Sequence, residues 1–476
     1  MTASQTILKQ TGLHIGGRFV SVLLGVAVLA TTTRLLGPAL FGVYGTALAY
    51  LQLFGILMDF GLTVTTLDAL GKSTVIEQKN IIGSLVVLRS LLSTITTAIA
   101  FIILQWFPYA PSIKHAIYLA SLLFIFYSFQ QLFTSVFQFK QSTMPIVVAE
   151  FFGRSATLLG LWVAAFFSGG VMSVILAGVI GNLVVILLLW RSAYQVLPWS
   201  LSLNTSLWKD ILVRSWPIGI SIAFNLVYFK ADTIILSLLR SSETVGLYSA
   251  PYKILEVLIA FPPLFLGMVL PRWSAAVAQK NWKEFQHWLE WTLSLTAMIA
   301  LPLVAGTLVT AHELMGFVAG SAYLESGAVL QVLIIATGSI FFANVFGYAI
   351  VALGLQKKMI PFYSSAAVSS LLLYYWAILR FGVLGAAWTT VLIEIFILFA
   401  GFFIVFASIK KKIMVPYLTK YVISSIIMYF FLFFTHNVIH ILFSVATGSF
   451  VYFFALYSIG GLNILKTREI TVLKGV

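Results

Sequence analysis

Long apolar runs constrain the fold of this chain more than any other feature. A helix needs about 20 mostly apolar residues to cross the hydrocarbon core of a bilayer. The runs are too long and too uniformly apolar to be barrel strands, so we predict transmembrane helices. Fourteen runs are long enough, with boundaries good to a few residues: 13–34, 41–66, 81–105, 115–137, 144–167, 171–190, 212–238, 244–270, 287–310, 327–353, 360–378, 383–408, 416–435 and 439–459.

The composition excludes a water-soluble fold. Of 476 residues, 61% are hydrophobic and 9% are charged, against about 25% charged in an ordinary globular domain. The absence of cysteine excludes disulfides, thiol catalysis and cysteine-ligated metal centres. In a membrane protein, an asymmetry between the loops explains the formal net charge of +14 better than nucleic-acid binding does. We therefore expect no nucleic-acid partner.

The distribution of basic residues predicts the orientation in the membrane. With the N-terminus inside, the inner connections and tails hold seventeen Lys and Arg residues. The outer connections hold only Arg34, Lys114, Arg240 and Arg380. By the positive-inside rule, we predict a multi-pass protein of the inner or plasma membrane with both termini cytoplasmic. The first run contains an Arg and no convincing cleavage site, so we expect a permanent span rather than a signal peptide.

A weak internal repeat predicts two lobes. Residues 34–44 read RLLGPALFGVY and residues 240–248 read RSSETVGLY, so in both places Gly-x-Tyr opens a helix after an Arg. Gly42 and Gly246 are 204 residues apart, which is six spans of 34. Because six is even, both copies have the same orientation. Chance recurrence of Gly-x-Tyr in an aromatic-rich chain is the alternative.

We therefore predict an all-α integral membrane protein of about fourteen transmembrane helices. Two six-helix lobes, related by a parallel pseudo-two-fold repeat, are followed by two C-terminal helices. The predicted parts are an N-terminal lobe (1–200, helices 1–6), a C-terminal lobe (201–412, helices 7–12), and helices 13–14 with a cytoplasmic tail (413–476).

The chain resembles a known family at these same helix ends. Residues 34–38 and 41–44, with Asp59-Phe60-Gly61-Leu62, resemble the first hairpin of polysaccharide-unit flippases. Residues 231–235 and 245–253 are similar to the seventh and eighth helices of those proteins. These are O-antigen and exopolysaccharide translocases of the multidrug/oligosaccharidyl-lipid/polysaccharide exporter superfamily. The resemblance covers nearly the whole chain in span number and lobe spacing, although its motifs describe helix ends rather than chemistry.

This resemblance implies two lobes around a central cavity. It also implies that a polyprenyl-pyrophosphate-linked oligosaccharide moves from the cytoplasmic to the outer leaflet by alternating access. An H+ or Na+ gradient would drive the movement, and no other cofactor is expected. The implied partners are the lipid-linked oligosaccharide, membrane lipids, and polysaccharide polymerase or assembly proteins.

Thirteen charged residues lie within the runs, and the candidate functional residues are among them, whereas Arg214, Lys420 and Glu290 lie close enough to a helix start to reach the cytoplasmic headgroups. Each costs roughly 2.5–3.5 kcal/mol at a helix centre, so each needs a partner, a wet cavity or an interface. Arg offers bidentate donors to a pyrophosphate and Lys a point charge. The thirteen residues are Arg18, Arg89, Arg154, Arg214, Lys230, Lys253, Lys420, Asp59, Glu150, Asp232, Glu256, Glu290 and Glu394.

Five of the basic residues are candidates for headgroup binding: Arg18, Arg89, Arg154, Lys230 and Lys253. Arg18 follows two glycines, whose missing side chains allow close packing or leave room for a headgroup. Snorkelling of Arg18 to the cytoplasmic interface is the alternative. Arg89 lies too deep to be explained by an interface. An ion pair with an acid one turn away is the alternative for Arg154, with Glu150, and for Lys253, with Glu256.

Three acids are candidates for ion coupling: Glu394, Asp59 and Asp232. Glu394 is a lone acid near the middle of the twelfth run, where burial favours the protonated form. Asp232 lies two residues from Lys230, so their side chains point to different faces of one helix and cannot pair directly. Aromatic platforms for sugars are a further expectation, with packing as the alternative, for Tyr44, Tyr50, Tyr228, Tyr248 and Tyr252.

Three other functions compete with a flippase of polysaccharide units. A drug or cation antiporter and a peptidoglycan-precursor flippase belong to the same superfamily. An integral-membrane glycosyltransferase or polymerase needs a sizeable extramembrane loop with catalytic residues, but the longest outer connection, 311–326, carries only His312, Glu313 and Glu325. The chain has no Walker A phosphate loop, so ATP is not the direct energy source. We expect a transporter rather than an enzyme.

Overall fold

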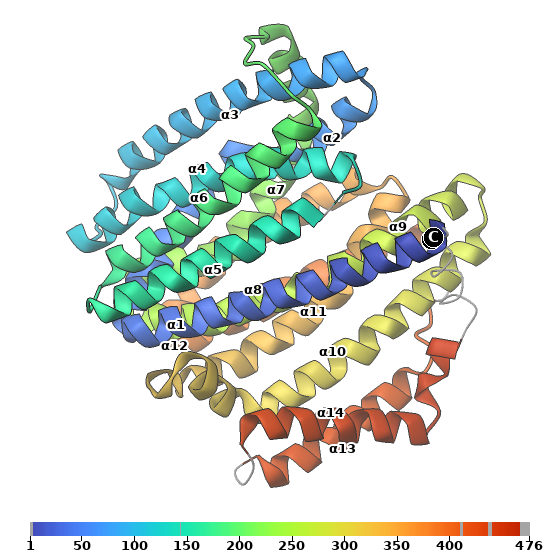
Figure 1. Ribbon diagram of the computed structural model, residues 1–476. Helices are drawn as coiled ribbons and strands as arrows, with labels where there is room; N and C mark the ends of the chain where they lie inside the picture. Colours follow the sequence, from blue (N-terminus) through green and yellow to red (C-terminus); the bar gives the residue numbers. More distant parts are fainter. Residues whose placement is uncertain (1–2, 143, 410–412, 437–439, 467–476) are drawn as a thin grey trace. The chain divides into compact units, whose positions relative to one another are not determined.

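The computed structural model describes residues 3–142, 144–409, 413–436 and 440–466, and within them every regular element is helical (Figure 1). The elements are α1 (Ala3–Asp59), α2 (Leu62–Gly71), α3 (Val75–Leu104), α4 (Pro111–Phe139), α5 (Met144–Phe166), α6 (Val171–Val196), α7 (Thr205–Leu239), α8 (Ser242–Ile259), α9 (Pro262–Ala278), α10 (Trp282–Ala319), η1 (Ser321–Tyr323), α11 (Ser326–Ala352), α12 (Gln356–Ile409), α13 (Leu418–Thr435), α14 (Ile441–Ser458) and η2 (Gly461–Lys466).

Two of these helices are pairs of helices joined at a glycine. Gly37 in α1 has φ 64° and ψ 174°, and Gly382 in α12 has φ 61° and ψ −137°. Only glycine adopts such angles without steric cost. Twelve segments of the described chain are long and apolar enough to span a membrane, and two of them contain these breaks. Dividing both segments gives fourteen crossings, which confirms the predicted fold class.

Two predicted runs are interrupted rather than continuous. Run 41–66 is broken between α1 and α2, where Phe60 and Gly61 have positive φ angles of 40° and 80°. Run 244–270 is broken between α8, which ends at Ile259, and α9, which begins at Pro262. Pro262 cannot donate a backbone hydrogen bond to the preceding turn, so it starts a new helix. Hydropathy alone hid both breaks because the residues around them are apolar.

Short polar side chains start several helices. Thr74 and Glu77 form a capping box at the start of α3. The side-chain oxygens of Asn204 and Asn281 accept bonds from backbone N–H groups of the first turns of α7 and α10, at 3.0 and 3.2 Å. Such caps satisfy backbone donors that have no partner within the helix. The polar connections of this apolar chain therefore determine where its helices begin.

The chain divides into two compact units, Met1–Gly246 and Leu247–Val476. In the first unit, α1 packs against α3, α4, α5 and α7, and α5 lies beside α6. In the second unit, α10 packs against α9, α11, α13 and α14, and α11 packs along α12. The lobe boundary predicted near residue 200 stays a prediction. The structure adds that α7, which we assigned to the second lobe, contacts α1, α2 and α3 of the first unit.

The glycines of the two Gly-x-Tyr motifs meet within the first unit. A Cβ atom at Gly42 would overlap the carbonyl oxygen of Ser242, and one at Gly246 would overlap the carbonyl oxygen of Pro38. The two contacts are equivalent under the repeat. Position 42 shifted by 204 residues is position 246, and position 242 shifted back by 204 residues is position 38. The repeat noted in the sequence therefore brings equivalent turns of α1 and α8 into backbone contact, which a larger residue would prevent.

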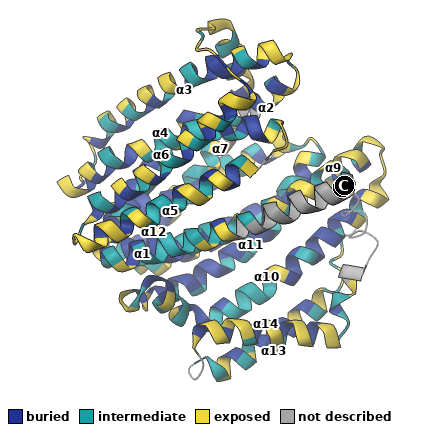
Figure 2. Ribbon diagram, viewed as in Figure 1, coloured by how far each residue is buried: buried dark blue, intermediate teal, exposed yellow. Residues whose placement is uncertain are grey.

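Many large apolar side chains are exposed in both units (Figure 2). Phe166 is 83% exposed, Leu372 71% and Phe450 70%. A soluble monomer rarely exposes apolar surface on this scale, because the surface would bind other molecules. In a bilayer such side chains meet lipid chains that are equally apolar. This surface agrees with a multi-pass membrane protein.

Candidate functional site

Two of the predicted site residues meet in the first unit. The guanidinium Nη2 of Arg89, on α3, lies 2.7 Å from Oδ1 of Asp59, the last residue of α1. The Arg89 side chain is fully buried, while that of Asp59 is 28% exposed. A buried guanidinium is tolerated only with a partner and hydrogen bonds to its remaining donors. The ion pair explains how Arg89 can lie inside an apolar helix bundle.

Helix α4 and the start of α2 add hydrogen bonds to this pair, although the buried Nε of Arg89 has no partner among the described residues. Arg89 Nη1 donates to the backbone carbonyl of Ser128 at 2.6 Å, and Nη2 donates to the hydroxyl of Thr63 at 3.1 Å. The Thr63 hydroxyl in turn donates to the Asp59 carboxylate. Sequence reasoning assigned Arg89 to the headgroup and Asp59 to ion coupling, and it missed their pairing. In this conformation Arg89 presents no surface to a headgroup, so that role stays a prediction.

A tyrosine and a glutamine lie next to this ion pair on α4. Tyr127 precedes Ser128 and is 51% exposed. The side-chain amide of Gln131 donates to the Tyr127 hydroxyl at 3.0 Å. The phenol lies within electrostatic range of the carboxylates of both Asp59 and Glu150. Helices α1, α4 and α5 therefore bring two acids, a phenol and an amide together, and the sequence analysis singled out neither Tyr127 nor Gln131.

The other predicted cation of this region, Arg154, lies against α1. Its guanidinium occupies the space that a side chain at Gly25 of α1 would fill. Pairing of Arg154 with Glu150, one turn earlier on α5, stays the alternative that we kept open. The side chain of Arg18 lies outside the described side chains.

Helix α7 carries a buried cation and a buried anion. Lys230 is 5% exposed and Asp232 is fully buried. The Lys230 ammonium lies 5.3 Å from the ring centroid of Phe229, and the Asp232 carboxylate accepts a bond from the Thr233 hydroxyl at 3.1 Å. The predicted roles of Lys230 in headgroup binding and of Asp232 in ion coupling stay predictions.

In the second unit, one predicted ion pair is present. Lys253 Nζ lies 2.7 Å from the carboxylate of Glu256, one turn along α8. Their side chains are 27% and 23% exposed. The alternative we kept open for Lys253, mutual neutralisation with Glu256, is therefore confirmed.

Glu394 is a buried acid on α12. Its side chain is 4% exposed, and it makes no ion pair with any residue that the structure describes. One turn earlier, the Thr390 hydroxyl lies 3.4 Å from that of Tyr248 and 3.1 Å from that of Tyr374. An unpaired carboxylate in such a place is expensive when charged. It can therefore hold a proton or a bound cation.

Most of the tyrosines that we predicted as aromatic platforms for sugars are buried. Tyr50, Tyr228, Tyr248 and Tyr252 are at most 3% exposed, and Tyr44 is half-buried. Four of the five rings therefore pack in the interior, which was the alternative interpretation. The half-exposed Tyr127 is the ring that stands beside charged groups in the first unit.

Two buried tyrosines instead join helices. The Tyr50 hydroxyl donates to the backbone carbonyl of Ala100 at 2.6 Å. Tyr109, in the α3–α4 connection, stacks edge-on against Tyr50 and lies 2.8 Å from the Ser237 hydroxyl on α7. Burial raises the pKa of Tyr109 to about 12, so its phenol stays neutral at physiological pH. These contacts fasten the α3–α4 connection to α1 and α7.

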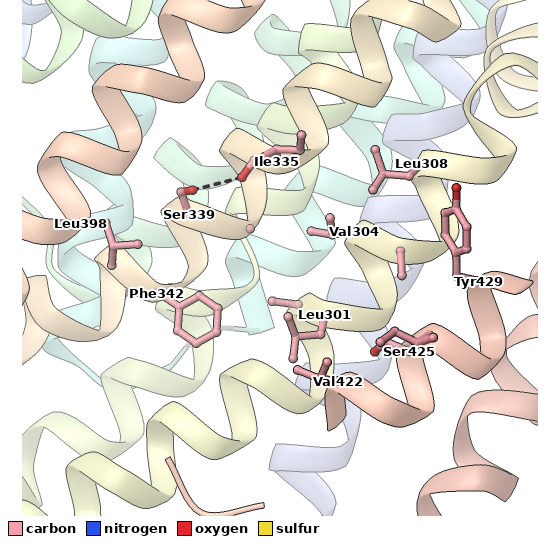
Figure 3. A pocket seen from close by; sticks show the side chains of 14 residues that line it. Leu301, Val304, Leu308, Ile335, Ser339, Phe342, Leu398, Val422, Ser425 and Tyr429 are labelled. Atoms are coloured by element: carbon pink, nitrogen blue, oxygen red, sulfur yellow. Dashed lines mark hydrogen bonds between the residues drawn. The ribbon is translucent and has the colours of Figure 1, made fainter. Parts of the chain in front are cut away.

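An apolar cavity of about 410 Å³ lies among α10, α11, α12 and α13 of the second unit (Figure 3). Its lining includes Leu301, Phe342 and Leu398. Of its few polar groups, the Ser339 hydroxyl is satisfied by the carbonyl of Ile335 on its own helix. A cavity with these walls suits a hydrocarbon chain rather than a polar group.

Comparisons with known proteins agree with this architecture. A family model described as "Polysaccharide biosynthesis protein" matches residues 7–276. A Shigella flexneri protein described as "Putative O-antigen transporter" is 25% identical over 401 residues, which cover 80% of this chain and 93% of that protein.

Two solved structures have a similar fold. The lipid II flippase MurJ, in an inward closed conformation, gives a TM-score of 0.79 at 13% identity and covers 96% of this chain and 100% of its own. A multidrug resistance MATE family transporter of the MOP superfamily, in an inward-facing conformation, gives 0.68 at 15% identity and covers 82% of this chain and 94% of its own. At these identities the likeness shows the fold alone.

Proposed function

This chain belongs to the polysaccharide biosynthesis protein family of membrane transporters, and we propose that it flips a polyprenyl-pyrophosphate-linked oligosaccharide from the cytoplasmic to the outer leaflet. It is a polysaccharide-unit flippase rather than an enzyme. Alternating access, driven by a proton or sodium gradient, is the mechanism we propose. Polysaccharide polymerase or assembly proteins would receive the product.

The observation that carries the proposal is the cluster of half-exposed polar side chains on membrane helices of the first unit. Gln131, Glu150 and Arg154 lie within α4 and α5, Asp59 is the last residue of α1 where it meets α2, and all four are half-buried. A charged group facing the bilayer centre costs roughly 2.5–3.5 kcal/mol on insertion scales. These groups therefore need a polar passage beside α1, α4 and α5, which a flippase requires and a lipid-facing surface does not.

Each chemical part of the substrate has a suitable counterpart. The pyrophosphate needs cations, and we propose Arg18 and Arg154 for it, because a guanidinium binds phosphate oxygens in a bidentate manner. Lys230 and Lys253 remain secondary candidates, because one is buried and the other is paired with Glu256. The prenyl chain needs an apolar surface, which the cavity among α10 to α13 offers.

We propose Glu394 as the coupling residue. Its side chain is buried and makes no ion pair within the described residues. Asp59 is the weaker candidate, because Arg89 already neutralises it. Asp232 remains a third candidate, buried in α7.

The test is deletion of the gene in its own host, followed by mass spectrometry of the lipid-linked saccharides. We expect one complete lipid-linked repeat unit to accumulate on the cytoplasmic side and the full-length gene to restore export. Accumulation of the peptidoglycan precursor would favour the peptidoglycan-precursor flippase instead. A change in drug sensitivity with no accumulated saccharide would favour the antiporter.

A further inference from the structure

The polar cluster of the first unit differs in kind from a phosphate site. The carboxylates of Asp59 and Glu150 lie within electrostatic range of the phenol of Tyr127, whose hydroxyl accepts the bond from Gln131. Arg89 ties Asp59 to the carbonyl of Ser128, the residue after Tyr127 on α4. The nearby guanidinium of Arg89 is fully buried behind Asp59. What the cluster exposes is therefore two acids, an aromatic ring and an amide.

The charges of this region balance. Asp59 and Glu150 carry two negative charges, while Arg89 and Arg154 carry two positive ones. The two half-exposed acids would repel a pyrophosphate placed against them rather than against Arg154, and the two arginines would repel a small cation. A neutral ligand with many hydroxyl groups would be repelled neither by the acids nor by the arginines.

The hydrogen-bonding groups of the cluster also match hydroxyls. Arg89 and Thr63 both bind Oδ1 of Asp59, and no donor of the described chain lies within hydrogen-bonding distance of Oδ2. A carboxylate oxygen accepts from a hydroxyl, a side-chain amide both donates and accepts, and bonds to a charged group are the stronger ones. The half-exposed ring of Tyr127 adds a flat apolar face with a polar rim.

We infer that Asp59, Tyr127, Gln131 and Glu150 form a saccharide-binding subsite, with Arg89 as the positioning residue that holds Asp59. The inference rests on the proposed function and deepens it, because it assigns the sugar and the pyrophosphate to different side chains. Asp59, Glu150 and Gln131 bind hydroxyl groups, and the Tyr127 ring packs against a sugar face.

The test compares two ligands on the purified full-length protein in lipid nanodiscs. One probe is the lipid-linked saccharide recovered from the deletion strain, and the other is polyprenyl pyrophosphate without sugar. Tyr127→Ala should weaken binding of the saccharide-bearing lipid about tenfold and leave binding of the sugar-free lipid within about twofold. Tyr127→Phe should keep most of the affinity, because the ring is retained.

Tyr375→Ala is the matched control. Tyr375 lies on α12 of the second unit, is 55% exposed, and lies outside the cluster. It should change the affinity for neither lipid. Because Tyr127 and Tyr375 are both half-exposed, neither truncation removes a core side chain.

The role of Arg89 has its own readout, the ratio of the affinities for the two lipids. Arg89→Lys keeps a charge for Asp59 but loses the second bond to the Ser128 carbonyl. We expect it to lower the affinity for the saccharide-bearing lipid selectively, and Arg89→Met to lower it further. If the role of Arg89 were purely structural, both variants would lower the affinities for the two lipids equally, and the ratio of these affinities would not change.

If Tyr127→Ala lowered the affinities for both lipids equally, or lowered neither, the saccharide subsite would be overturned. The proposed function would remain intact. If the wild-type protein bound neither lipid and the deletion strain accumulated no saccharide, the proposed function would fail, and the subsite with it.

Discussion

At the scale of residues, Arg89 shows how this chain tolerates charge in a bilayer. Its side chain is fully buried but bonds a carboxylate, a hydroxyl and a backbone carbonyl from three other helices. Removing one partner of such a buried pair typically costs about 3–5 kcal/mol. Asp59 thus supports the fold of the first unit and also exposes an oxygen, so one residue has a structural and a binding role.

Glu394 is the contrasting case, because no cation compensates it among the described residues. Glu394→Gln keeps the shape of the side chain but cannot release a proton or balance a sodium ion. If Glu394 couples transport to a gradient, the variant should lose the dependence of flipping on external pH or sodium. The measurement is flipping of labelled lipid-linked saccharide in proteoliposomes under imposed gradients.

Glu325→Gln, an exposed acid before α11, is the control and should keep the wild-type dependence. An unchanged response of Glu394→Gln to both gradients would remove Glu394 from the coupling mechanism and leave Asp59 and Asp232 as candidates.

At the scale of elements, glycine decides how α1 is built and what it contacts. Gly37 breaks the helix with a positive φ, and Pro38 follows it. One turn later, Gly42 meets the first turn of α8, where Gly246 makes the equivalent contact with α1. Because the contact is between backbones, it brings this turn of α1 and the first turn of α8 closer together than side chains would permit.

Alanine substitution tests this contact. Gly42→Ala and Gly246→Ala each place a methyl group on a backbone carbonyl, and overpacking of this kind costs about 1–3 kcal/mol. We expect both variants to lower the Tm of the protein in detergent and to reduce export.

Gly267→Ala and Gly347→Ala are matched controls, because a Cβ atom there meets nothing within 4 Å. Alanine in a helix with free space stabilises by about 0.4–1 kcal/mol, so these variants should keep or raise the Tm. Equal Tm values for all four variants would show that the contact between α1 and α8 is not tight in solution.

At the scale of the whole molecule, apolar surface and basic connections predict one orientation in the bilayer. The chain contains no cysteine, so single cysteines can be labelled without background. Lys72 lies in the α2–α3 connection and Ala110 in the α3–α4 connection, and both are exposed. A membrane-impermeant maleimide should label Ala110→Cys in intact cells but Lys72→Cys only after lysis. The reverse pattern would contradict the positive-inside orientation.

The sequence alone was sufficient for the helical class, the fourteen crossings and the family. Solvation decides these features: each apolar run must satisfy its backbone polar groups internally in lipid, so the length of each run reveals a span. The sequence also indicated the ion pair of Lys253 and Glu256, because these two residues are one helical turn apart. Such properties are local and need no knowledge of neighbouring helices.

Only the tertiary structure decided which charges meet. Arg89 and Asp59 are separated by 30 residues of chain, and nothing in their local pattern relates one to the other. Arg154 has the spacing of a pair with Glu150, and nothing in that local pattern places its guanidinium in the space that Gly25 leaves open on α1. Most of the predicted tyrosine platforms are buried, while Tyr127 is exposed beside two acids. Helix packing brings distant residues together, and hydrophobic periodicity carries no information about which faces meet.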